Sequence, residues 1–245
     1  MDRLQLDKNA KLTGRVYFKD EVMWLGLSGS GASFTFDGTK LVLKLKGDNI
    51  AVGENPIDYA RIAVYVDGKR VVDEMIDCAE KEVTVIDHTE NAQSVVEIIK
   101  LSESPMSAVG VEAFTEGSAE ALPEKPLKIE FIGDSITCGY GVDDEDENHQ
   151  FTTATEDVTK AYAYKTAKAL DAEYSMFSAS GYGIVSGYTE GDEPISEQTI
   201  PQFYCSYGFS RGNFAGTAPQ DIPWDFSKYI PQIIVINLGT NDDSY

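Results

Sequence analysis

The sequence predicts an all-β domain followed by an α/β domain, and three observations support this organisation. Residues 1–118 contain many short runs rich in β-branched and aromatic residues, separated by glycine and aspartate turns, as in a β-sandwich or jelly roll. Residues 119–126 are broken by prolines and predict a linker. From residue 127 to residue 245, apolar strands alternate with a helical segment, which is the order of an α/β sheet.

The elements of the first domain are short strands. They are expected at residues 34–36, 41–45, 61–66, 83–86, 95–99 and 108–111. Several of them alternate apolar and polar residues, as strands with one buried face do. Asp37–Gly38 and Asp67–Gly68 predict turns. Because no long helix interrupts the strands, we expect a jelly-roll sandwich.

The second domain is predicted to contain a parallel sheet. Its strands are expected at residues 127–132, 174–179 and 233–238, with a helix over 158–169. The last strand is continuously apolar, as buried parallel strands are. Only three strands of the flavodoxin-like order 2-1-3-4-5 are recognisable, and the third would lie at an exposed edge. We therefore expect the chain to hold the N-terminal part of a longer α/β domain.

The composition limits the class of partner. The 245 residues include 20 lysines and arginines against 41 aspartates and glutamates, a net charge of −21. This charge argues against nucleic acid and anionic membranes and leaves neutral substrates open. No apolar run approaches a membrane span. The three cysteines are scattered and form no C-x-x-C pair, so neither a disulfide scaffold nor a zinc site is expected. No cofactor is predicted. The N-terminus lacks an apolar signal region, which predicts a cytoplasmic protein, or a secreted one if a leader has been removed.

The motif Gly133-Asp134-Ser135 is the strongest chemical signal in the chain. It follows the first predicted strand of the α/β domain directly. The carboxyl ends of such strands are where open α/β sheets bind their ligands. A turn is the alternative interpretation, but the preceding apolar strand and the following Ile-Thr-x-Gly favour Ser135 as a nucleophile.

Two further blocks follow the other predicted strands. Asn241 comes after the third strand, and its side-chain amide could donate a hydrogen bond near Ser135, as an oxyanion hole requires. The segment Ser180-Gly181-Tyr182-Gly183 follows the second strand, and glycine there lets a backbone N–H approach a ligand. Taken alone, each block could also be a simple turn.

These three blocks, in this order, resemble the SGNH (GDSL-type) hydrolases. The resemblance implies that Ser135 is the nucleophile and that Ser135, Gly181 and Asn241 form the oxyanion hole, with Gly183 as an alternative alignment for Gly181. The β-rich region ahead of them, together with residues 130–141 and 224–227, resembles carbohydrate esterase family 2. That family pairs a jelly roll with an SGNH domain and removes O-acetyl groups from plant polysaccharides such as xylan. The resemblance implies acetylated xylan or another acetylated oligosaccharide as substrate.

The general base of that family is not found in this sequence. The family places its histidine in a late Asp-x-x-His block, whereas this chain has only His88, in a predicted turn, and His149, in a loop after Ser135. We expect the base to come from a missing C-terminal segment. The acidic run at residues 143–147 is interpreted as a solvated loop, because it lacks the spacing of an EF-hand calcium site.

Two alternative functions remain open from the sequence. The chain could belong to another SGNH short-chain esterase or thioesterase, which a preference for longer acyl chains would reveal. It could also be a carbohydrate-binding protein with an incomplete hydrolase domain, which would bind xylan without turnover. Five aromatic residues are candidates for a sugar cleft or for packing of their own loop: Phe203, Tyr204, Tyr207, Phe209 and Phe214. The oligomeric state, including a homo-oligomer, is left open.

Overall fold

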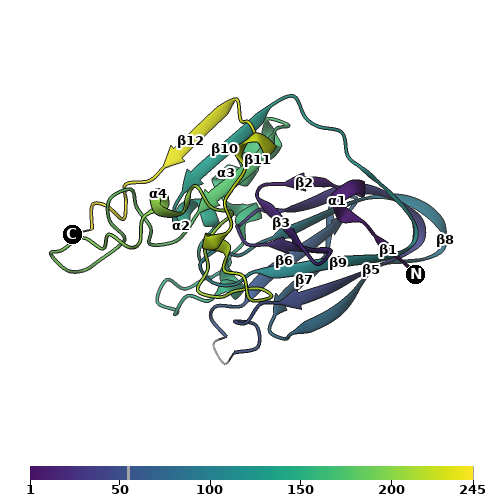
Figure 1. The fold of residues 1–245 in the computed structure, drawn as a ribbon, viewed down its shortest axis with the longest axis horizontal. Helices are drawn as coiled ribbons and strands as arrows, with labels where there is room; N and C mark the ends of the chain where they lie inside the picture. The colour runs from purple at the N-terminus through teal and green to yellow at the C-terminus, as the bar shows by residue number, and fades with distance from the viewer. Residues whose placement is uncertain (54–55, 245) are drawn as a thin grey trace.

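The computed structural model describes residues 1–53 and 56–244 and contains two sheets (Figure 1). The first sheet is antiparallel, and its path runs β3-β4-β9-β5-β8-β6-β7, with β1 beside β9 and β2 beside β5. Its strands are β1 (Asp2–Leu4), β2 (Lys11–Thr13), β3 (Val16–Lys19), β4 (Val22–Leu25), β5 (Gly31–Gly47), β6 (Ala60–Val66), β7 (Lys69–Ile76), β8 (Glu80–Lys100) and β9 (Val109–Ala121). A short helix, α1 (Leu6–Asn9), joins β1 to β2.

Two of these strands are much longer than the sequence indicates. The runs at 34–36 and 41–45 are parts of one strand, β5, so the turn expected at Asp37–Gly38 is wrong. Instead, the register shifts between Gly38 and Lys40, as at a β-bulge. A side chain at Gly38 would lie 2.4 Å from the carbonyl oxygen of Glu116, so the glycine permits close approach of the strands. Similarly, the runs at 83–86 and 95–99 both belong to β8.

The turn expected at Asp67–Gly68 is present between β6 and β7. Both of its residues have positive φ, 50° at Asp67 and 78° at Gly68, as a type I′ hairpin turn requires. Strand β9 runs to Ala121, so residues 119–121, expected in the linker, are strand. The connection to the second sheet is therefore shorter than expected.

The second sheet has three parallel strands in the order β11-β10-β12. They are β10 (Lys128–Gly133), β11 (Glu173–Ser178) and β12 (Ile233–Asn237), each close to its expected place. The helices of this half are α2 (Ser135–Cys138), α3 (Tyr162–Ala169) and α4 (Ile200–Phe203), with 3₁₀ turns η1 (Thr153–Thr155), η2 (Val158–Lys160), η3 (Pro219–Asp221) and η4 (Phe226–Lys228). The helix expected from residue 158 starts only at Tyr162, because the Asp157 carboxylate caps Thr159 N–H in a separate 3₁₀ turn.

Strand β12 lies at the edge of this sheet, as expected for the third strand (Figure 1). Among the described residues it pairs only with β10. Its apolar side chains remain accessible: Ile234 is 54% exposed and Ile236 is 63% exposed. No helix in the described ranges is long and apolar enough to cross a membrane.

The aromatic residues of the segment after α4 pack the two halves of the chain together. The Tyr207 hydroxyl donates to the carbonyl of Trp24 at 2.7 Å, and Phe214 stacks on the Trp24 ring. Phe209 is buried against Phe177. Of the two alternatives for these rings, a sugar cleft or packing of their loop, the structure shows packing for Tyr207, Phe209 and Phe214, which are buried.

Candidate active site

The register of the small sheet brings the three sequence blocks to one edge. Gly133, the last residue of β10, pairs with Ser178 on β11 and with Asn237 on β12. The loops that carry Ser135, Gly181 and Asn241 therefore all leave the sheet at its carboxyl edge, where open α/β sheets bind ligands (Figure 1).

Ser135 is the first residue of the short helix α2 and is partly exposed. The buried Asp134 carboxylate accepts a hydrogen bond from Ile136 N–H and caps this helix. Gly133 is required by close packing, since an added Cβ would lie 2.0 Å from Thr137 Oγ1. The Ser135 hydroxyl makes no hydrogen bond to any part of the chain that the structure describes, and it is therefore free to meet a ligand.

Asn241 connects the loop after β12 to the loop after β11. Its side chain is buried, and Nδ2 donates to the carbonyl oxygen of Tyr182 at 2.8 Å. Gly181 has φ of +80°, and no atom lies within 4 Å of a Cβ placed on it, so it borders open space. Gly183 is packed instead, because a Cβ there would lie 2.1 Å from the Ser186 carbonyl oxygen. The geometry favours Gly181 over Gly183 as the residue that faces a ligand.

Asp242 was missed by sequence reasoning. Its carboxylate accepts hydrogen bonds from three consecutive backbone N–H groups, those of Ile184, Val185 and Ser186. Burial acts to raise the pKa of Asp242, but these N–H groups outweigh it and hold the pKa below the usual value. The residue thus fastens residues 184–186 to the loop that carries Asn241. No local pattern around Asp242 signals this role, which depends on a contact 56 to 58 residues away.

The two histidines do not complete the site. Both ring nitrogens of His149 face carboxylates of its own loop, Nδ1 at 2.9 Å from Asp144 and Nε2 at 3.7 Å from Asp146. His88 is exposed and lies within strand β8, so its expected place in a turn is wrong. In residues 1–53 and 56–244, neither histidine contacts Ser135.

The acidic run at residues 143–147 is not simply a solvated loop. Asp143 pairs with Arg61 at 2.9 Å and also contacts the Lys160 ammonium. Desolvation opposes the effect, but the two cations lower the pKa of Asp143. This end of the run therefore ties the loop to strand β6.

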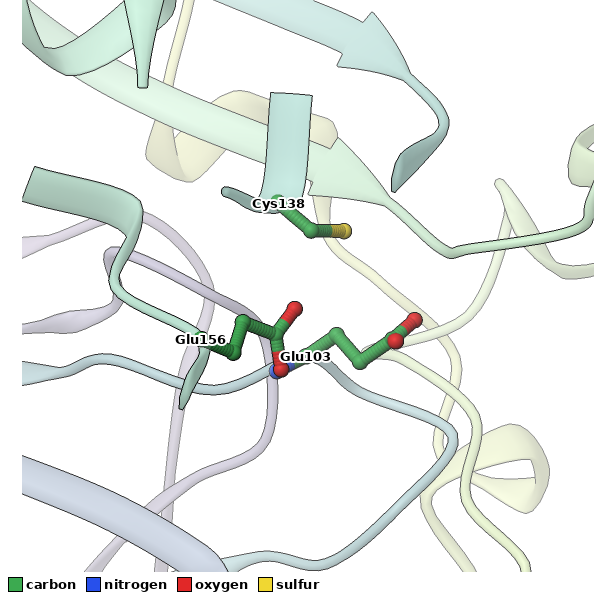
Figure 2. Close-up of side chains that lie close together, drawn as sticks. All are labelled: Glu103, Cys138 and Glu156. Atoms are coloured by element: carbon green, nitrogen blue, oxygen red, sulfur yellow. The ribbon is translucent and has the colours of Figure 1, made fainter. Parts of the chain in front are cut away.

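One group of side chains has metal-ligand chemistry. Glu103, Cys138 and Glu156 are fully buried, and their ligand atoms lie within 4.8 Å of one another (Figure 2). Burial and the neighbouring carboxylates raise the pKa of the Cys138 thiol well above its usual value, which favours the protonated form. Its Sγ lies 3.2 Å from Ser178 Oγ. Glu103 Oε1 and Glu156 Oε1 have no hydrogen-bond partner among the described residues, and the Cys138 thiol would have to lose its proton to bind a metal ion.

Comparisons with known proteins agree with this architecture. A model of the carbohydrate esterase 2 N-terminal domain matches residues 12–126. The chain is 33% identical to the cellulase/esterase CelE of Acetivibrio thermocellus over 89% of this chain and 24% of that protein. It is 29% identical to an acetylxylan esterase / glucomannan deacetylase of Cellvibrio japonicus over 97% of this chain and 62% of that protein. The chain thus spans less than two thirds of these relatives.

Solved structures show the same fold. A family two carbohydrate esterase from Clostridium thermocellum, determined in complex with cellohexaose, superposes with a TM-score of 0.78 at 29% identity and covers 96% of this chain and 67% of that chain. An acetyl xylan esterase from Butyrivibrio proteoclasticus superposes with a TM-score of 0.83 at 21% identity, over 100% of this chain and 66% of that chain. Residues 12–126 therefore match the carbohydrate esterase 2 N-terminal family, and the chain as a whole is similar to the carbohydrate esterases of family 2.

Proposed function

We propose that this chain forms most of a serine esterase that removes O-acetyl groups from xylan or a related polysaccharide. The main observation behind this proposal is that the loops of Ser135, Gly181 and Asn241 leave the same edge of the parallel sheet. They do so because Gly133 pairs with Ser178 on one side and with Asn237 on the other. The names of the relatives support acetyl groups as the target, and the cellohexaose complex supports a β-linked sugar chain as the binding partner.

In the proposed reaction, a histidine takes the proton from Ser135 Oγ, and Oγ attacks the acetyl carbonyl carbon. The resulting oxyanion accepts hydrogen bonds from the N–H groups of Ser135 and Gly181 and from the Asn241 amide. The C–O bond to the sugar then breaks, and the sugar oxygen takes the proton from the histidine. Water hydrolyses the acetyl-enzyme by the same steps and releases acetate.

We further propose that the first half is a jelly roll and the second half an incomplete SGNH domain, with the histidine supplied by further polypeptide. An apolar hollow beside β12 supports this. It is lined by Ile132, Ile184, Ile200, Pro201, Tyr204, Cys205, Ile236 and Leu238. The exposed isoleucines of β12 would be covered if another element packed against this edge.

The test measures acetate release from acetylated xylan. The protein assayed, called here the complete catalytic unit, is this chain together with the polypeptide proposed to supply the histidine. We expect release, and a sharp preference for p-nitrophenyl acetate over longer p-nitrophenyl esters. A preference for longer acyl chains would favour a lipase-like esterase or a thioesterase. Binding of xylan without any acetate release would favour a carbohydrate-binding protein instead.

Asn241→Ala is expected to lower kcat by about 10²–10³-fold, the usual effect of removing one oxyanion-hole donor. KM should change little, since the oxyanion exists only after attack. The matched control is Asn9→Ala, because Asn9 Nδ2 also donates to a backbone carbonyl, that of Ala119, but in the other sheet. An unchanged kcat in Asn241→Ala would remove Asn241 from the site.

A further inference from the structure

A buried cluster of charged side chains lies against the loop that follows β11. It combines Lys100, from the end of β8, with Glu103, from the loop after β8, and Glu156, from the loop after η1. Figure 2 shows the two glutamates of this cluster. All three are inaccessible to solvent. Burying a charge is costly unless it is paired or hydrogen-bonded, so the burial of these three side chains indicates a structural or functional role.

One hydrogen bond connects this cluster to the candidate site. The Ser180 N–H donates to Glu103 Oε2 at 2.6 Å. Ser180 directly precedes Gly181, the proposed oxyanion-hole residue. A hydrogen bond from a backbone N–H to a buried carboxylate is short and strong compared with one between neutral groups.

Glu103 is itself held on both sides of its backbone. Its N–H donates to Glu156 Oε2 at 2.9 Å, and its carbonyl oxygen accepts from Lys100 Nζ at 3.0 Å. Lys100 Nζ also donates to the Ser102 carbonyl oxygen at 2.6 Å. The backbone of Glu103 is therefore fixed by two buried charged groups, Lys100 and Glu156. This limits the movement of the Glu103 carboxylate relative to the loop after β11.

Burial changes the pKa of all three charged groups in the cluster. Burial raises the pKa of Glu103 and, with the nearby Glu103 carboxylate, that of Glu156. Burial lowers the pKa of Lys100, although the carboxylates oppose this.

The other contacts of the loop after β11 hold the chain on the C-terminal side of the Gly181 N–H. Asn241 Nδ2 donates to the Tyr182 carbonyl oxygen at 2.8 Å. The Gly181 carbonyl accepts from Tyr188 N–H at 2.7 Å, and Tyr182 N–H donates to the Ala179 carbonyl at a longer 3.3 Å. Gly181 has a φ of +80°, and because it has no side chain its backbone can adopt more conformations than that of other residues. Ser180 is therefore the residue on the N-terminal side of Gly181 through which Glu103 can fix the direction of the Gly181 N–H.

We infer that Glu103 is a positioning residue: its carboxylate, on the β-rich domain, holds the Ser180 N–H and so fixes the Gly181 N–H for the oxyanion. This inference rests on the proposed esterase function. It also assigns a role to the first domain: Glu103 of that domain positions a loop of the active site. This role is separate from any binding of the polysaccharide.

The experiment compares Glu103→Ala and Glu103→Gln in the complete catalytic unit. We expect Glu103→Ala to lower kcat on p-nitrophenyl acetate about 10- to 100-fold, because small misplacements of a catalytic group are costly. KM should stay within about threefold of the wild-type value, since the oxyanion forms only after binding. Glu103→Gln keeps an acceptor oxygen and should recover most of the lost kcat.

The matched control is Asp48→Ala. Asp48 is another buried carboxylate that accepts backbone N–H groups, those of Ile50, Ala51 and Ala108, but it does not touch the loop after β11. Hydrogen exchange should be faster at the Ser180 amide in Glu103→Ala and unchanged there in Asp48→Ala. This readout separates loss of the anchor from general loss of stability.

Three outcomes would overturn the inference. The first is unchanged exchange at Ser180 in Glu103→Ala, and the second is faster exchange with unaltered kcat. The third is about one divalent metal ion per chain in the wild-type protein that is absent from Glu103→Gln, because Glu103 would then be a ligand. A wild-type unit without esterase activity would contradict the proposed function instead, and exchange at Ser180 would still show whether Glu103 anchors the loop.

Discussion

Ser135→Ala is expected to reduce acetate release from acetylated xylan by about 10⁴- to 10⁶-fold, the scale seen when a nucleophile that acts with its base as a unit is removed. The reason is that no acetyl-enzyme can form without Oγ. The residual rate would come from substrate binding and from the oxyanion donors, which the substitution leaves in place. The measurement is acetate release by the complete catalytic unit under identical conditions for both proteins.

The fold should survive this substitution. Ser135 is partly exposed, its hydroxyl has no partner in the described chain, and the helix cap is provided by Asp134. The control is Ser118→Ala, an exposed serine on β9 in the other sheet, which should leave both activity and stability unchanged. Equal activity in wild type and Ser135→Ala would exclude Ser135 as the nucleophile.

Arg15→Ala is expected to lower the free energy of unfolding by about 3–5 kcal/mol, the usual cost of removing one partner from a buried ion pair. Arg15 lies between β2 and β3 and is completely buried. Its guanidinium donates to the carbonyl oxygens of Tyr204 and Ser206 at 2.6 and 2.5 Å, and it lies 3.5 Å from Glu130. These partners all belong to the second half of the chain.

The same guanidinium, from the first half, also lies over aromatic rings of the second half. It lies 4.4 Å from the ring centre of Phe177 and 4.8 Å from that of Tyr204. Cation–π contacts of this kind add to the stability when they are desolvated. Alanine would leave the two carbonyl oxygens without this donor, and it would remove the cation that faces Glu130.

Urea unfolding measures this effect, with Arg3→Ala as the matched control. Arg3 also pairs with carboxylates, Glu21 at 2.9 Å and Glu112 at 2.7 Å, but its side chain is 30% exposed. The pair with Glu21 is exposed and contributes about 0–1 kcal/mol. The buried Glu112 keeps a second cation, Lys46 at 2.7 Å, so the control should destabilise the protein much less than Arg15→Ala. Equal destabilisation by the two substitutions would contradict a special role for Arg15 in joining the halves.

The strand positions of the second domain could be predicted because they depend on local sequence. The continuous apolar runs around β10, β11 and β12 are long enough to identify buried strands, and Ser135 and Asn241 follow two of them directly. Parallel order then places those residues at one edge without further information. The Asp67–Gly68 turn was likewise predictable, because its backbone conformation is specific to those residue types.

The long strands of the first domain could not be predicted from the same kind of pattern. The Asp37–Gly38 pair has the composition of a turn, yet it lies inside β5, because pairing with both β8 and β9 stabilises the extended chain. Pairing energy comes from strands far apart in the sequence, and it outweighed the local preference.

The sequence by itself therefore determined the candidate nucleophile, its two helper blocks and the division into a β-rich and an α/β half, since each is written in a short contiguous pattern. Only the tertiary structure decided what supports them. Glu103 reaches Ser180 across 77 residues, Arg15 reaches Ser206 across 191, and Asp242 reaches Val185 across 57. Buried charges find their partners through folding of the whole chain, and no local spacing records which partner each will meet.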